Sequence, residues 1–427
     1  MYNPYPILDI GLLSSHFLVN CKLYLPVKIR SAILALILFA GCCSSNAFSQ
    51  DSIRFDFCDV PVRFAFNKSE FVDFTAPLSQ ESIKIFYENL SATHYQPVIE
   101  EIVTYKNEHM LDDWLFYQLI RRTAESISPK ADNYNRYTLY KWFLLAKSGY
   151  NTTVNICGDQ ILFYVQSNDS IYNLPVHYKQ GKQYVCLNYH DYGSNIDFEK
   201  NKFSEVAITV PEATHTFSYK IKQLPAFKPS DYEEKNLQFY VDQTEYDIKV
   251  KLNPEIKKMF TNYPVTDYES YFNIPLSKET YASLIPLLKK NIKGLSKKNG
   301  IDYLMRFTRY AFLFEPDSIT FGREKRLSPE QTLLYDYSDC EDRAALFFYL
   351  VKEIYDLPML VLSYPKHVTI AVKLNKPIGK PIIYNGEKYT ICEPTPQGED
   401  LRVGQVSRDL KKISYEIVYA YMPQKRS

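Results

Sequence analysis

The chain has no excess of either charge, because its 50 Lys and Arg residues are balanced by 49 Asp and Glu residues, for a formal net charge of +1. Without a basic surplus to neutralise phosphates, the composition argues against a nucleic-acid partner or an anionic membrane surface. Glycine is also scarce, at 13 residues, and no glycine-rich phosphate loop is present. No CxxC motif or Cys/His ligand cluster occurs, so we expect neither a metal site nor a cofactor.

The remaining composition is that of a globular protein. Apolar residues make up 46% and aromatic residues 15% of the 427 positions, which is enough for two or three domains with sizeable cores. Tyrosine is unusually frequent, at 37 residues. Tyrosine suits both half-buried strands and wet binding surfaces, and composition alone does not choose between them.

The N-terminus has the features of an export signal. Lys28 and Arg30 precede the apolar run AILALILFAG at 32–41, which is short for a membrane span. Ala47-Phe48-Ser49 fits a small-x-small cleavage site that would leave Gln50 first. Alternatively, FAGC resembles a lipoprotein box that would lipidate Cys42, or the run stays uncleaved as an anchor. We favour cleavage and expect a periplasmic or secreted protein, attached to a membrane only if Cys42 carries lipid. Residues 1–26 fit no signal pattern, which would follow if they come from upstream translation that the true product lacks.

Five of the eight cysteines remain after residue 49: Cys58, Cys157, Cys186, Cys340 and Cys392. An odd number in an exported protein leaves at least one thiol unpaired, or paired between chains.

Three pairs of segments suggest an internal duplication. FTAPLSQES at 74–82 matches FNIPLSKET at 272–280, and LYKWFLLAKSGY at 139–150 is similar to LFFYLVKEIYDL at 346–357. GKQYVCLN at 181–188 then matches GEKYTICE at 386–393. The alternative is a coincidence between short helix and strand patterns.

The matches divide the mature chain into three regions. We predict a degenerate first copy at 50–200, a β-rich connecting region at 201–260 and a second copy at 261–427. The connecting region alternates apolar and polar residues in VAITV, HTFSYKIKQL and LQFYVDQTEYDIKVKL, which predicts strands.

The second copy places a cysteine at the start of a helix. Two helices are predicted within 277–314, and another begins at SDCEDRAALFFYL, where Ser338 or Asp339 is a credible N-cap. Cys340 then lies in the first turn, where backbone N–H groups and the helix dipole favour a thiolate. The neighbouring carboxylates are expected to serve the cap or nearby loops and to leave the sulfur free.

Three strand-like segments follow this helix: MLVLSY, HVTIAVKL and KYTICEPT. His367 opens the second strand and Glu393 ends the third. An antiparallel sheet packed on the cysteine helix could bring both residues over its N-terminus, with His367 forming an ion pair with Cys340 and Glu393 orienting the ring. Cys392 should point to the opposite face of its strand and belong to the core.

These motifs resemble the Cys-His-Asp core of the transglutaminase-like superfamily. SDCED is similar to the GDCED of bacterial transglutaminase-like cysteine peptidases, and CEPT is similar to the DPT of transglutaminase cores. The resemblance covers about residues 275–420. It implies an α+β, papain-like fold in which a cysteine-bearing helix packs on an antiparallel sheet.

The resemblance also implies a catalytic triad. Cys340 is the expected nucleophile, His367 the general base and acid, and Glu393 the orienting acid. The chain has Glu393 where the family usually has Asp, and Ser338 where it has Gly. The backbone N–H of Cys340 is the expected oxyanion donor, with Gln331 and Tyr337 as further candidates.

Two functions from different classes follow. The first is an exported cysteine peptidase or amidase acting on a protein or peptide substrate, or less readily a cross-linking transglutaminase. The second is a non-catalytic protein that binds a peptide or glycan at the cell surface. The first copy has neither SDCED nor an equivalent of His367, so it retains the scaffold without the reactive groups.

Overall fold

The computed structural model describes residues 52–424, and the predicted signal region, including Cys42, lies outside this part of the chain. The described residues mix α-helices with antiparallel sheets, which confirms the α+β class. The described residues belong to one compact unit, and the predicted boundaries within it stay predictions. Among the described residues, no helix is long and apolar enough to cross a membrane.

The first half begins with a hairpin and four helices, which a five-stranded sheet follows. Its elements are β1 (Ser52–Phe57), β2 (Val60–Ala65), α2 (Gln80–Ser91), α3 (Gln96–Glu108), α4 (Asp113–Ile127), α5 (Tyr134–Lys147), β3 (Thr152–Cys157), β4 (Gln160–Gln166), β5 (Val176–Lys179), β6 (Lys182–Cys186) and β7 (Ser204–Glu205).

The second half begins with a long hairpin, continues through several helices and ends in another five-stranded sheet. Its elements are β8 (Glu233–Val241), β9 (Thr244–Leu252), α6 (Glu255–Met259), α7 (Tyr268–Phe272), α8 (Lys278–Asn291), α9 (Lys297–Tyr310), β10 (Leu313–Phe314), α10 (Asp317–Thr320), α11 (Pro329–Leu334), β11 (Tyr337–Ser338), α12 (Cys340–Tyr355), β12 (Met359–Tyr364), β13 (His367–Val372), β14 (Ile382–Tyr384), β15 (Glu387–Cys392) and β16 (Glu416–Tyr421). The predicted helices within 277–314 are α8 and α9, and the three predicted strands are β12, β13 and β15.

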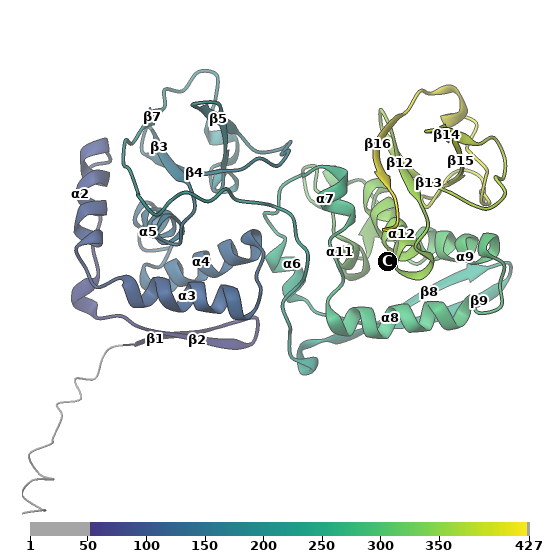
Figure 1. The fold of residues 1–427 in the computed structure, drawn as a ribbon, viewed down its shortest axis with the longest axis horizontal. Coiled ribbons are helices and arrows are strands. Elements are labelled where there is room, and N and C mark those ends of the chain that lie inside the picture. The colour runs from purple at the N-terminus through teal and green to yellow at the C-terminus, as the bar shows by residue number, and fades with distance from the viewer. Residues whose placement is uncertain (1–51, 425–427) are drawn as a thin grey trace, which may run out of the picture. The chain divides into compact units, whose positions relative to one another are not determined.

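The two five-stranded sheets have the same strand order. The first runs β5-β6-β4-β3-β7 and the second β14-β15-β13-β12-β16. In each, the two central strands form a tight antiparallel hairpin directly after a buried helix, α5 or α12. Figure 1 shows α12 beside β12 and β13. Helix and strands are therefore connected in the same sequence in both halves.

Each sheet buries both faces, as alternating strand side chains predict. Val368, Ile370 and Val372 of β13 belong to the main core, which they share with α12, whereas Ala371 packs with Leu360 in a smaller cluster on the other face. The sheet of the first half has a corresponding small cluster. The hairpin β8–β9 packs against α8 and α9 (Figure 1).

Two of the three strands predicted in the connecting region do not form. LQFYVDQTEYDIKVKL forms β8 and β9, whereas residues 206–224 make only isolated bridges to the first half. Phe217 and Tyr219 are buried, so the alternation reflects one buried face. Aspartate side chains replace the missing strand partner, because Asp113 accepts a hydrogen bond from the backbone of Ser218 and Asp169 one from that of Tyr219.

One glycine, Gly404, allows a close loop contact beside the end of β15. Gly404 donates its N–H to the Ile391 carbonyl at 2.8 Å and has a φ of +87°. A Cβ at this position would lie 2.7 Å from Cγ2 and 2.8 Å from the carbonyl oxygen of Ile378. Gly386 also has a positive φ, of +77°, but a Cβ there would meet nothing within 4 Å.

We therefore expect Gly404→Ala to destabilise the protein more than Gly386→Ala. The unfavourable φ costs about 1–2 kcal/mol in both variants, and overpacking adds about 1–3 kcal/mol only at Gly404. Urea unfolding of the two variants measures the difference. Equal losses of unfolding free energy would show that the loop contact is not tightly packed.

Candidate active site

Asp339 fixes the start of the cysteine helix. Its carboxylate accepts hydrogen bonds from the backbone N–H groups of Glu341 and Asp342, and Asp342 accepts one from the backbone of Asp339 in return. This capping box satisfies N–H groups that a helix otherwise leaves unpaired. Cys340 is consequently held in the first turn of α12. Of the two predicted N-cap residues, Ser338 and Asp339, Asp339 caps the helix.

A buried arginine anchors the same turn. Arg343 is fully buried and donates hydrogen bonds to the carbonyl oxygens of Arg309 at 2.6 Å and Phe312 at 3.0 Å. It also reaches the carbonyl of Ser338 at 3.4 Å. One guanidinium group thus joins the cysteine turn to the end of α9, a role that sequence reasoning did not identify.

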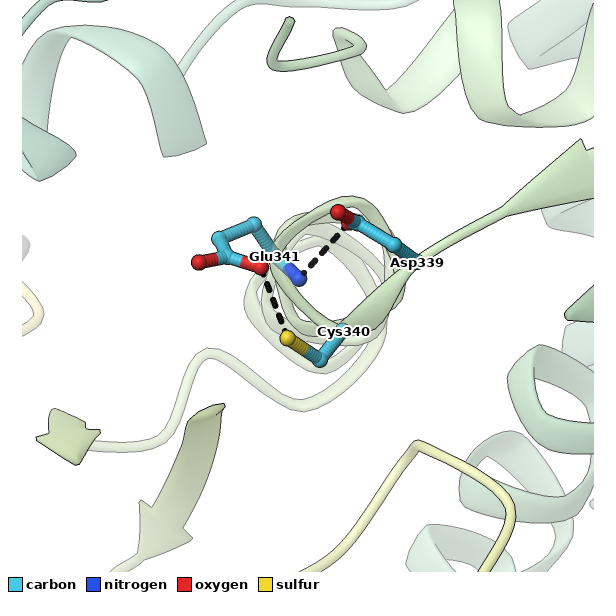
Figure 2. A group of neighbouring side chains, drawn as sticks. All are labelled: Asp339, Cys340 and Glu341. Carbon is cyan, nitrogen blue, oxygen red and sulfur yellow. Dashed lines mark hydrogen bonds between the residues drawn. The ribbon is translucent and has the colours of Figure 1, made fainter. Parts of the chain in front are cut away.

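The sulfur of Cys340 faces a carboxylate. The thiol donates a hydrogen bond to Glu341 Oε2, with a sulfur–oxygen distance of 2.7 Å (Figure 2). Burial raises the pKa of the Cys340 thiol, and the negative charges of Glu341 and Asp339 raise it further. The expectation that the neighbouring carboxylates leave the sulfur free is therefore wrong for Glu341. In this state the sulfur is a thiol and not a thiolate.

The strand that bears His367 reaches the sulfur through its backbone. The backbone N–H of Val368 lies near Cys340 Sγ and lowers the thiol pKa, which partly offsets the increase. His367 is the preceding residue, so the start of β13 lies at the N-terminus of α12. Among the described residues, no hydrogen bond joins the His367 ring to Cys340.

His367 and Glu393 form the predicted pair. His367 Nε2 lies 2.8 Å from Glu393 Oε2, and both side chains are largely buried, with exposed fractions of 12% and 3%. Burial alone would lower the pKa of His367, but the hydrogen bond and charge of Glu393, with a contribution from Glu341, outweigh it and raise the pKa. Since Nε2 is occupied, Nδ1 is the ring nitrogen available for proton transfer.

Several backbone contacts hold Glu393 in place. The N–H of Thr395 donates to Glu393 Oε1 at 3.0 Å, and Arg309 donates to the Glu393 carbonyl oxygen. Arg309 also donates to the Leu401 carbonyl at 2.8 Å. The carboxylate therefore keeps a fixed orientation toward the ring. No motif in the sequence points to Arg309, which lies 84 residues from Glu393.

Two groups of side chains near Cys340 have atoms spaced as metal ligands are. In the first group, carboxylate oxygens of Asp317, Asp339 and Asp342 lie within 4.8 Å of one another. In the second, the carboxylate oxygens of Asp339 and Glu341 and the sulfur of Cys340 lie within the same distance. Burial and the neighbouring carboxylates raise the pKa of Asp339 to about 8 and that of Asp317 to about 7. Protons retained on these groups at neutral pH offset the repulsion, and we assign no metal to them.

The remaining predicted residues have mixed positions. Gln331 is buried in α11, where its Oε1 accepts from the Ser328 backbone and its Nε2 has no partner among the described residues. Tyr337 is exposed in β11. No hydrogen bond connects either residue to Cys340, so an oxyanion role stays a prediction for both. Cys392 is buried in the main core, as predicted.

The first sheet has different side chains at the matching places. Tyr134 opens α5 where Cys340 opens α12, and Gln160 opens β4 where His367 opens β13. Asn188 lies two residues after β6 and matches Glu393 in the sequence alignment. Asn188 Nδ2 donates to the Tyr134 hydroxyl at 3.1 Å, so this topology brings the first and third positions into contact.

We predict that Glu393→Gln lowers the pKa of His367, because burial then acts without the compensating charge. The raised folded-state pKa means that the pair adds stability below about pH 6.5, the ordinary value for histidine. That stability is lost as the pH rises through the folded value. Glu387→Gln, a change to an exposed residue of the same strand, is the control.

Proton NMR titration of the histidine rings, with His367 assigned by its loss in His367→Gln, measures the shift. Unfolding experiments on Glu393→Gln should show the largest loss at low pH. An unchanged His367 pKa would contradict the assigned pair.

Comparison with known proteins gave no match to a family model, a curated protein or a solved structure. The similarity to the transglutaminase-like superfamily therefore stays a prediction from the motifs. Any function assigned to this site rests on the side chains that meet at the N-terminus of α12.

Proposed function

We propose that the second half of the chain is a thiol-dependent acyl-transfer enzyme that acts on amide or peptide bonds. The observation that carries the proposal is the 2.8 Å pairing of His367 Nε2 with Glu393 Oε2. His367 opens a strand whose second residue, Val368, lies close enough to the Cys340 sulfur to lower its pKa. A nucleophile, a base and an orienting acid thereby meet at one helix N-terminus.

The reaction begins with the thiol proton. His367 Nδ1 accepts it, and Glu393 stabilises the imidazolium that forms. The sulfur attacks the carbonyl carbon of the amide, and the tetrahedral oxyanion accepts a hydrogen bond from the Cys340 backbone N–H, which has no other partner among the described residues. His367 returns the proton to the leaving amine, which leaves a thioester on Cys340.

The thioester can react with water or with an amine. Water makes the protein a peptidase or amidase, which is the outcome we favour, and an amine makes it a transglutaminase. A protein or peptide is the proposed substrate in either case. The N-terminal export signal would place the reaction in the periplasm or outside the cell.

We further propose that the two halves are copies of one papain-like unit. The identical strand order of the two sheets supports this duplication, and so does the contact between Tyr134 and Asn188 at the matching places. In the first copy a tyrosine, a glutamine and an asparagine replace the three reactive groups, so its function is structural or binding.

One observation favours the alternative of a non-catalytic protein that binds a peptide or glycan. The hydrogen bond to Glu341 and the raised thiol pKa keep Cys340 protonated at rest. In a binding protein the Cys340 thiol would stay protonated, whereas an enzyme must deprotonate it when substrate binds.

Cys58 provides an internal comparison for a test. It is half-buried like Cys340. Burial and the negative charges of Asp59 and Glu255 raise its thiol pKa, as burial and carboxylates do at Cys340. None of these groups is an imidazole. Differences in reactivity between the two cysteines therefore report on His367.

We predict that Cys340 reacts with iodoacetamide at least about tenfold faster than Cys58, and that His367→Ala removes this advantage. Peptide mapping by mass spectrometry assigns each modified cysteine. The same preparation, incubated with a peptide mixture, should give new N-termini with the wild type but none with Cys340→Ala. Equal labelling of both cysteines, unchanged in His367→Ala, would favour the binding protein.

A further inference from the structure

The side chain of Glu341 lies beside the nucleophile without a cation of its own. One carboxylate oxygen accepts a hydrogen bond from the Cys340 thiol, and the other points away from the sulfur (Figure 2). Among the described residues, no lysine or arginine forms a salt bridge with Glu341. An acidic side chain next to a reactive thiol thus keeps a free oxygen for a partner.

The surrounding side chains are mostly acidic. Asp339 caps the helix, and Asp317 and Glu324 lie close enough for Glu341 to raise the pKa of each. His367 is also affected by this charge, because Glu341 contributes to the increase in its pKa. Since Asp339 and Asp317 retain protons at neutral pH, Glu341 is the main source of negative charge at the nucleophile.

Nearby cations are directed elsewhere. Arg326 stacks over the Tyr268 ring at 4.2 Å and donates to the Thr266 carbonyl. Lys325 lies 4.6 Å from the centre of the Phe321 ring. Neither forms a salt bridge with Glu341, so this carboxylate is available to a cation from another molecule.

We propose that Glu341 selects substrates that carry a positive charge beside the amide under attack, such as a lysine or arginine side chain of a peptide. This inference rests on the acyl-transfer function proposed above and names its substrate class. The substrate cation forms a salt bridge with Glu341, and the Glu341 carboxylate no longer accepts the hydrogen bond of the Cys340 thiol. His367 Nδ1 can then accept the thiol proton, so the correct substrate also activates the nucleophile.

Charged methanethiosulfonates test the selection without requiring turnover. In each reaction the Cys340 thiolate attacks the sulfenyl sulfur, a mixed disulfide forms and methanesulfinate leaves. The cationic trimethylammonium-ethyl, neutral methyl and anionic sulfonatoethyl reagents differ mainly in charge. Their rates at Cys340, each divided by the rate with free glutathione, measure the local preference.

In the wild type we expect the cationic reagent to be preferred over the anionic one by about tenfold or more. Raising the salt concentration to 1 M should reduce the preference, because exposed charges are then screened. Glu341→Gln should lower it by about tenfold. Glu353→Gln, which removes the same charge near the other end of α12, should leave it unchanged.

Two results would overturn this inference: no charge preference in the wild type, or a preference that Glu341→Gln leaves intact. Neither would remove the acyl-transfer proposal if the neutral reagent still reacts faster at Cys340 than in His367→Ala. Loss of that dependence on His367 would instead remove the proposed function itself. The salt titration uses only the wild type and so does not depend on the folding of a variant.

Discussion

The capped first turn of α12 is the constraint on which the site depends. Asp339 satisfies the N–H groups of this turn, and Arg343 ties it to the end of α9. Removing Arg343 would leave buried carbonyl oxygens unpaired, at a cost of about 1–3 kcal/mol each. The same turn positions Cys340 for the strand that carries His367, so stability and chemistry share one set of contacts.

The two sheets show how one topology accepts different chemistry. The two halves have corresponding places at three positions: the start of the helix, the start of the second strand of the hairpin, and the segment just after the neighbouring strand. In the second half these places hold Cys340, His367 and Glu393. In the first half Tyr134 and Asn188 occupy two of the corresponding places and form a hydrogen bond with each other.

Local patterns in the sequence predicted most of the second half. The helix signals predicted α8, α9 and α12, and the strand signals predicted β12, β13 and β15. The antiparallel sheet expected from these strands, together with the resemblance, predicted the pairing of His367 with Glu393. The contact between Glu341 and the sulfur was not predicted, because the direction of a side chain depends on rotamers that no motif encodes. Long-range contacts such as that of Arg309 with Glu393 were missed for a related reason, since only the folded chain brings them together. In the connecting region, alternation alone could not separate a strand from an extended segment held by aspartates.

The proposed active site requires that His367 stabilises a Cys340 thiolate once Glu341 no longer accepts the hydrogen bond of the thiol. The most direct measurement is the thiol pKa of Cys340, from ultraviolet absorbance of the thiolate against pH, in Glu341→Gln and in Glu341→Gln combined with His367→Ala. We predict that Glu341→Gln lowers the thiol pKa below its wild-type value and that adding His367→Ala raises it again. Equal thiol pKa values in the two variants would show that the histidine does not act on the sulfur, and would contradict the proposed active site.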